Sequence, residues 1–134
     1  NSALARVLDD YDALLFLDID DIPQPALISS AKQYAKENDV TGIGMWMVED
    51  GEIVGGFGAP PDIRAYNVHG YGNTVYRTDV LRELIPLTDD YTTAIRALDK
   101  GYGLAFEPLP LIHYRQYGQN SNIIEVKGGR AWRI

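Results

Sequence analysis

The sequence predicts an α/β domain with a mixed sheet flanked by helices. Residues 3–36 follow the order helix, strand and helix, which is the alternation of an α/β layer. The unbroken apolar run Leu14–Leu17 is typical of a strand buried on both faces, as in the centre of a parallel or mixed sheet. A chain of 134 residues is long enough for one core. We therefore expect a single domain over residues 1–134.

Composition excludes several classes of partner and site. The formal net charge is -7, which argues against a nonspecific nucleic-acid or anionic-membrane surface. The absence of cysteine excludes disulfides and thiolate metal sites. No apolar run approaches the roughly 18 residues of a membrane span, and no signal peptide is recognisable. We expect a cytoplasmic protein with no membrane span and no nucleic-acid partner.

The first half of the chain carries clear patterns. Apolar residues at positions 3, 4, 7 and 8 share one helical face, so a short helix is expected there. Pro25 suits the first turn of a second helix that extends to about Lys36. Its apolar stripe is Leu27, Ile28, Ala31, Tyr34 and Ala35. Residues 40–48 and 52–57 favour paired strands, joined by a hairpin turn at Glu-Asp-Gly.

The middle of the chain is irregular. Glycine and proline break any periodicity over Gly55–Gly72, which also carries Arg64, Tyr66, His69 and Tyr71. A long loop of this kind is either a substrate-facing loop or a plain surface excursion, and both interpretations stay open.

The second half returns to regular patterns. Thr78 suits the N-cap of a short helix that ends at Pro86, and Thr88 suits the N-cap of a helix that ends at Gly101. Short strands are expected over residues 103–106 and 110–114. Residues 114–120 read as a polar loop, and the last seven residues show no period.

The strongest chemical signal is a group of carboxylates directly after the first strand. Asp18, Asp20 and Asp21 fall within four positions, and Pro23 and Pro25 prevent the strand from continuing. Ligands of open α/β sheets bind beyond the carboxyl ends of strands. Carboxylates that repel one another suit Mg²⁺ or Mn²⁺ with a phosphate as co-ligand. The pattern predicts a metal-phosphate site, and its alternative is an ordinary turn.

A second acidic pair, Asp89 and Asp90, follows Thr88. Acidic residues in a first helical turn are favoured by the helix dipole, so the pair alone favours a structural role.

Three segments taken together resemble the family 2 glycosyltransferases of the GT-A fold, and most closely the bacterial rhamnosyl- and galactosyltransferase-like members. In those enzymes an Asn-Ala helix precedes a strand ending Leu-Asp-x-Asp-Asp, a Glu-Asp pair opens a later helix carrying an Arg, and Tyr-Arg-x-His-x-x-Asn follows. The matching segments here are residues 1–25, 88–101 and 114–120, in the same order. The resemblance implies a partial GT-A fold, the C-terminal metal- and acceptor-side portion of such a domain, without the N-terminal portion that binds the nucleotide.

The resemblance also implies roles for single residues. Asp18 and Asp20 match the metal motif, with Asp20 as the direct ligand of Mn²⁺ or Mg²⁺ that bridges the phosphates of a nucleotide-diphosphate sugar. Asp90 matches the general base that takes a proton from the acceptor hydroxyl. The implied substrate-binding positions are Asp18, Asp89, Arg96, Arg115 and Asn120.

Two positions depart from the family pattern. Asp89 stands where Glu is usual, and Tyr117 replaces the usual His of the last motif. His113, four positions earlier, is the candidate substitute as a metal ligand.

The expected function is therefore metal-dependent, inverting transfer of a sugar from a nucleotide-diphosphate sugar to a glycan or another hydroxyl acceptor. The isolated chain is expected to bind metal weakly and to transfer little or no sugar. An incomplete sheet would leave an exposed edge or apolar face, which favours a homo-oligomer or a partner for the absent N-terminal half.

Two alternatives stay open. A haloacid-dehalogenase-like phosphatase would use Asp18 as nucleophile, Asp20 as acid-base, and Asp89 with Asp90 as a distal metal pair. A non-catalytic α/β module would bind a glycan or a protein through the Gly- and Tyr-rich loop.

Overall fold

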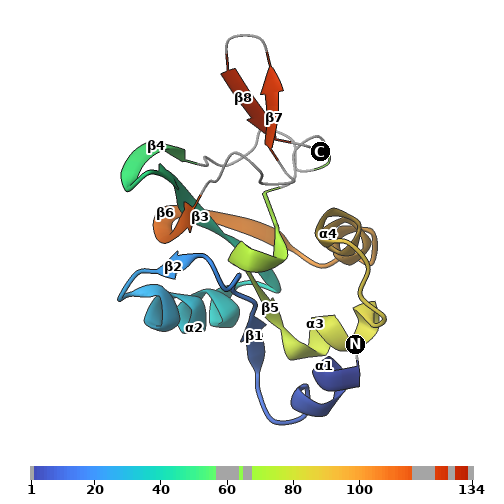
Figure 1. The fold of residues 1–134 in the computed structure, drawn as a ribbon. Coiled ribbons are helices and arrows are strands. Elements are labelled where there is room, and N and C mark those ends of the chain that lie inside the picture. The colour runs from blue at the N-terminus through green and yellow to red at the C-terminus, as the bar shows by residue number, and fades with distance from the viewer. Residues whose placement is uncertain (1, 57–63, 65–67, 116–122, 127–128, 133–134) are drawn as a thin grey trace.

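The computed structural model describes residues 2–56, 64, 68–115, 123–126 and 129–132, with side chains described over 3–56, 64 and 68–115. It is a mixed α/β domain in which helices flank a curled mixed sheet (Figure 1). The helices are α1 (Ser2–Val7), α2 (Leu27–Glu37), the 3₁₀ turn η1 (Tyr71–Asn73), α3 (Thr78–Leu84) and α4 (Asp90–Asp99). The α/β class predicted from the sequence is confirmed. Within the described residues, no helix has both the length and the apolar character needed to cross a membrane.

The sheet has the order β1, β5, β3, β6, β2, and β4 pairs with β3 on a branch of this path. Its strands are β1 (Ala13–Leu15), β2 (Ile22–Pro23), β3 (Val40–Glu49), β4 (Glu52–Gly56), β5 (Thr74–Arg77) and β6 (Leu104–Arg115). β5 is antiparallel to both β1 and β3, while β3 and β6 are parallel. It follows that β1, β3 and β6 run in one direction and end at the same edge of the sheet. We call this the upper edge, and the opposite one the lower edge.

Helices cover both faces of the sheet and form two cores. Successive side chains of a strand point to opposite faces, and in β5 Tyr76 packs toward α3 and α4 while Val75 packs toward α2. The first core, on the side of α1, α3 and α4, contains Leu8, Val40, Tyr76, Val80, Leu81, Leu84 and Ala97. The second core, beneath α2, contains Leu27, Ala31, Ile43, Met45, Val75, Leu111 and Ile112.

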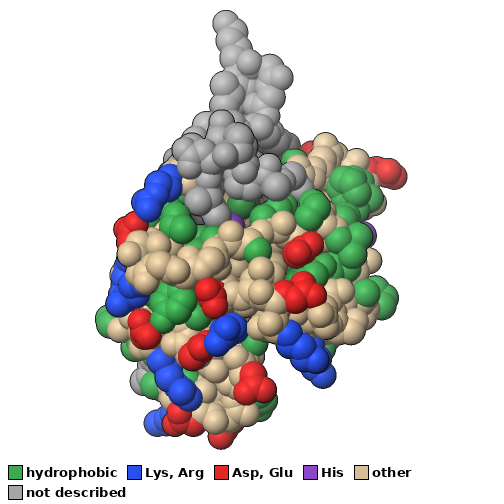
Figure 2. All heavy atoms as spheres, turned by 180° about the vertical axis from the view of Figure 1, so that it is seen from behind, with side chains coloured by type: hydrophobic (Ala, Val, Ile, Leu, Met, Phe, Trp, Pro, Cys, Tyr) green, Lys and Arg blue, Asp and Glu red, His purple; other side chains and the backbone are tan. Residues whose placement is uncertain are grey.

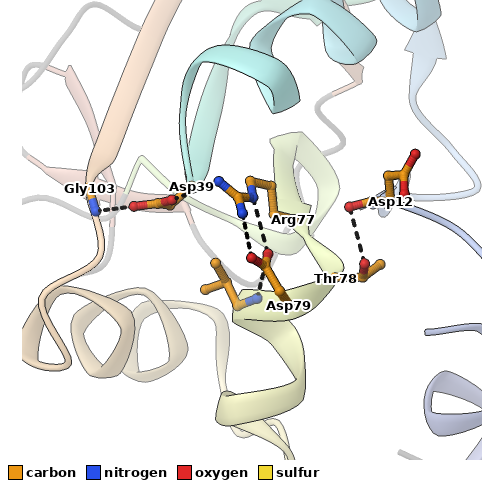
Figure 3. Close-up of polar contacts among 7 residues, drawn as sticks. Asp12, Asp39, Arg77, Thr78, Asp79 and Gly103 are labelled. Atoms are coloured by element: carbon orange, nitrogen blue, oxygen red, sulfur yellow. Dashed lines mark hydrogen bonds and ion pairs between the residues drawn. The ribbon is translucent and has the colours of Figure 1, made fainter. Parts of the chain in front are cut away.

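The lower edge is held by paired charges and backbone hydrogen bonds (Figure 3). Arg77, at the end of β5, makes ion pairs with Asp79 and with Asp39, the second at 3.3 Å. Asp39 also accepts a 2.9 Å hydrogen bond from the backbone N–H of Gly103, just before β6. The Thr78 hydroxyl donates to the carbonyl of Asp12, just before β1, at 3.1 Å. The beginnings of β1, β3 and β6 are thus tied to the end of β5.

The first strand differs most from its prediction. Leu14–Leu17 was expected to form a central strand, but β1 covers only Ala13–Leu15, is half-buried, and is the outermost strand at its end of the described sheet. Its neighbour β5 is antiparallel to it. An apolar run reports burial but not the number of neighbouring strands, which is why the position in the sheet was wrong.

Other boundaries were confirmed or need correction. The hairpin turn is confirmed, with positive φ at Asp50 and Gly51. The two short strands expected over residues 103–114 are one strand, β6, and the helix expected to be capped by Thr88 is capped by Asp89. Ile28 was expected on the buried stripe of α2 but is 61% exposed. Near the end of the chain, β7 (Ile123–Val126) and β8 (Gly129–Trp132) pair as antiparallel strands.

A shift of register separates the two halves of the β3–β6 pairing. The shift lies on either side of Gly44, where β6 contains Pro108 and Pro110. A Cβ atom added to Gly44 would lie 2.4 Å from the carbonyl oxygen of Pro108. The glycine therefore lets the backbones of the two longest strands approach each other.

Gly44→Ala should lower the free energy of unfolding by about 1–3 kcal/mol or more, because the added methyl group meets backbone that has no free end to move aside. Urea unfolding followed by circular dichroism measures the change. The matched control is Gly103→Ala, since the nearest atom to a Cβ there is 3.7 Å away. An equal effect of the two substitutions would contradict the explanation.

Candidate functional site

The upper edge of the sheet gathers acidic side chains from distant parts of the sequence. Asp18 and Asp20 follow the end of β1, and η1 leads into the start of β5 beside it. Helix α4 runs from Asp90 toward Gly101 and Gly103, so its first turn lies at the end opposite to the lower edge. The topology therefore brings residues 18–21, 70–73 and 89–90 to one region.

Asp18 and Asp90 lie against the same four-residue segment, Gly70–Asn73. A Cβ atom on Gly72 would lie 2.6 Å from Oδ2 of Asp18, and one on Gly70 would lie 3.4 Å from Oδ2 of Asp90. Asp18 and Asp90, which are 72 positions apart in the sequence, thus both lie against the segment Gly70–Asn73.

The carboxylates of this region influence one another. Partial burial raises the pKa of Asp18 above its usual value, and the nearby charges of Asp20 and Asp90 raise it further. Each added negative charge makes ionisation of its neighbour less favourable. Ionisation of Asp18 is therefore less favourable in the folded chain than in the unfolded chain.

Asp21 is the buried member of the acidic cluster, with 7% of its surface exposed. Neither of its carboxylate oxygens has a hydrogen-bond partner of normal geometry among the described residues. Burial raises the pKa of Asp21 to about 7, with further contributions from Asp18 and Asp20, while the backbone and charge of Arg115 act in the opposite direction. Burial and the neighbouring carboxylates therefore make ionisation of Asp21 costly, and Arg115 offsets part of that cost.

Two candidate residues lie on β6. Arg115, at its end, donates from Nε to the backbone carbonyl of Asp20, so it is brought to the acidic cluster. His113 is half-buried and lies in register with Ile22 of β2 and Trp46 of β3. Asn120, like Tyr66 and Tyr117, lies outside the described residues.

Asp89 and Arg96, at the start and in the last turn of α4, both make hydrogen bonds within the fold. Asp89 is the N-cap residue, and its Oδ1 accepts a 3.0 Å hydrogen bond from the backbone N–H of Thr92. Hydrogen bonding from the side chain of Thr92, together with that from its backbone N–H, lowers the pKa of Asp89. Arg96 donates from Nη1 to the carbonyl of Pro86 at 3.2 Å. Asp89 thus has a structural role, as the sequence pattern alone favoured, but it is the N-cap residue where Thr88 was expected.

The sequence analysis named Tyr71 as a loop residue but did not predict its contacts, and it missed Asn73; both side chains hold the segment Gly70–Asn73 in place. The Tyr71 hydroxyl bonds the carbonyl of Thr88 and Oγ1 of Thr93, each at 2.7 Å, and its ring packs on Phe16. The buried Asn73 amide donates to the carbonyls of Ile43 and Val68, each at 2.9 Å. The available signal was Gly-Tyr-Gly-Asn directly before a β-prone run.

His69 fixes the chain just before this segment. It is 1% exposed, and its Nε2 lies 2.9 Å from the carbonyl oxygen of Ala105. Its Nδ1 is buried and has no partner among the described residues. Burial lowers the pKa of His69, because a second proton would charge the ring in an apolar environment.

This lowered pKa predicts loss of stability in acid. Below about pH 6.5 the unfolded chain takes up a proton at His69 that the folded chain resists, so the free energy of unfolding falls as the pH falls. His69→Gln retains a donor for Ala105 but cannot titrate there. Chemical unfolding should show a smaller loss between pH 7 and pH 5 for His69→Gln than for the wild type.

The comparison needs a reference range. Between pH 8 and pH 9 His69 is almost entirely neutral in both states, so the stability difference between the two proteins should stay constant. Parallel curves down to pH 5 would contradict the role assigned to burial.

No group of three or more His, Cys, Asp or Glu side chains is arranged to hold a metal ion in the part of the chain that the structure describes. Asp18, Asp20 and His113 are accordingly not grouped into a three-residue metal set, and the metal assignments stay predictions. On the described part of the face shown in Figure 2, acidic and basic side chains are interspersed. No protein-family model matches the chain, and the search of curated proteins found no match.

Proposed function

We propose that this chain is the metal- and acceptor-side portion of a family 2 glycosyltransferase of the GT-A fold. It would transfer a sugar, with inversion, from a nucleotide-diphosphate sugar to an acceptor hydroxyl. The observation that carries the proposal is the position of Asp18 and Asp90 against one segment at the upper edge of the sheet, with the charge of Asp20 close to Asp18.

The donor side of the proposed site consists of Asp18 and Asp20. Mg²⁺ is commonly bound by one or two carboxylates together with substrate phosphates, so two aspartates and a diphosphate fit Mn²⁺ or Mg²⁺ without a third protein ligand. The metal would supply Lewis-acid stabilisation of the charge on the leaving diphosphate. Asp21 is buried next to Asp18 and Asp20 and belongs to the same acidic cluster.

Arg115 is the proposed basic partner of the diphosphate. Its guanidinium already bonds the backbone of Asp20, so it brings a positive charge next to the acidic cluster. A charge placed there would stabilise a leaving diphosphate in the same way as the metal.

The acceptor side depends on Asp90. Its carboxylate lies against Gly70, whereas the carboxylate of Asp18 lies against Gly72. In an inverting displacement the nucleophile attacks the anomeric carbon from the side opposite to the leaving group. Asp90 would accept the proton of the attacking hydroxyl, which is the work of a general base. The two carboxylates lie against different glycines of the segment Gly70–Asn73, which suits this separation of roles.

The test is a calorimetric titration of Mn²⁺ into the chain, alone and with UDP or dTDP. We expect the nucleotide to strengthen Mn²⁺ binding in the wild type, because its phosphates complete the coordination. Asp20→Asn should weaken this binding by about 10- to 100-fold.

Asp10→Asn is the matched control, since Asp10 is exposed and undergoes the same change of charge. It should bind as the wild type does. If neither metal nor nucleotide binds, or if both bind Asp20→Asn as well as the wild type, the proposal fails, and a non-catalytic binding module becomes the better interpretation.

A further inference from the structure

Gly70 and Gly72, in the segment Gly70–Asn73, are required because a larger side chain would meet neighbouring atoms. Their backbone conformation does not itself require glycine. The described glycines with positive φ are Gly51 and Gly101, whereas Gly70 has φ -62 and Gly72 lies outside the left-handed region. Alanine could adopt either backbone conformation. The side chain it would add at Gly72 instead meets the carboxylate of Asp18 at 2.6 Å.

The segment that carries these glycines is firmly anchored on two sides. Asn73 joins it to the centre of the sheet through the carbonyl of Ile43. Tyr71 joins it to the start of α4 through Thr88 and Thr93, and to the end of β1 through Phe16. Figure 1 shows η1 at the start of β5, next to β1. A segment held in this way fixes Asp18 and the start of α4 relative to each other.

We infer that Gly70–Asn73 is a positioning element: Gly72 determines where the Asp18 carboxylate lies, and Tyr71 determines where the helix turn carrying Asp90 lies. The contacts of Gly72 and Tyr71 are features of the structure. Their effect on sugar transfer rests on the proposed function. Both are positioning residues, because they act through the two aspartates.

In a Gly72→Ala variant, displacement of the Asp18 side chain costs less than displacement of the backbone at position 72. The contacting atoms are the end of a flexible side chain, whereas Gly72 itself is fixed by neighbouring anchors. The carboxylate would therefore rotate away while the fold persists. A cation that needs Asp18 and Asp20 together would lose one of its ligands.

A double-mutant cycle tests this contact without any ligand. Gly72→Ala should lower the urea midpoint when Asp18 is present, and should leave it unchanged in the Asp18→Ala background, where the obstructing carboxylate is absent. Gly103→Ala is the control for the general effect of adding a methyl group at a glycine, and should act equally in both backgrounds. An equal loss from Gly72→Ala in both backgrounds would overturn the inference.

A second readout measures metal binding. Calorimetry should show Mn²⁺ binding weakened about 10-fold or more by Gly72→Ala and unchanged by Gly103→Ala. Unchanged Mn²⁺ affinity in a folded Gly72→Ala protein would overturn the role of Gly72. If the wild type binds no Mn²⁺, the proposed function fails, and the urea cycle alone decides the inference about Gly72.

Tyr71→Phe tests the other half of the element. It retains the ring that packs on Phe16 but removes the hydroxyl that bonds Thr88 and Thr93. Hydrogen exchange over residues 88–94 should become faster, with exchange in α2 unchanged. The exposed Tyr11, changed to Phe, is the control and should leave both regions unchanged. Wild-type exchange over residues 88–94 in Tyr71→Phe would overturn the role of Tyr71.

Discussion

The antiparallel pairing of β5 with both β1 and β3 is the constraint on which the rest of the molecule depends. Because β5 runs against its two neighbours, the segment that enters it meets the segment that leaves β1. Gly70–Asn73 and Asp18 are thereby placed side by side. If β5 ran in the other direction, Arg77 would lie at the upper edge and the acidic cluster would lose its support.

Acidic residues have different neighbours at the two edges of the sheet. At the lower edge Asp39 and Asp79 are paired with Arg77, and a further pair joins Asp9 to Arg82 at 2.7 Å. At the upper edge acidic side chains lie close to one another, and their mutual repulsion is an energetic cost in the folded chain. Ionisable groups whose pKa values are shifted by burial and by neighbouring charges often cluster at functional sites.

The sequence predicted local structure well and spatial relations less well. The hairpin at Asp50 and Gly51 and the helix α2 follow from turn chemistry and periodicity, which are local properties. The edge position of β1 depends on strand pairing over some sixty residues, and no local pattern encodes it. The acidic residues were recognisable as candidates, yet the burial of Asp21 and the space left by Gly72 exist only after the chain has folded.

The position of β1 has a consequence for the durability of the site. β1 is three residues long, half-buried, and paired within the described sheet only with β5. Such an element opens at a lower free energy than the core around β3 and β6. Asp18 would then leave Asp90 in a partially open state while the domain stays folded. A ligand that contacts both aspartates would stabilise the closed state of β1. Ligand binding would therefore increase the local order at this end of the sheet.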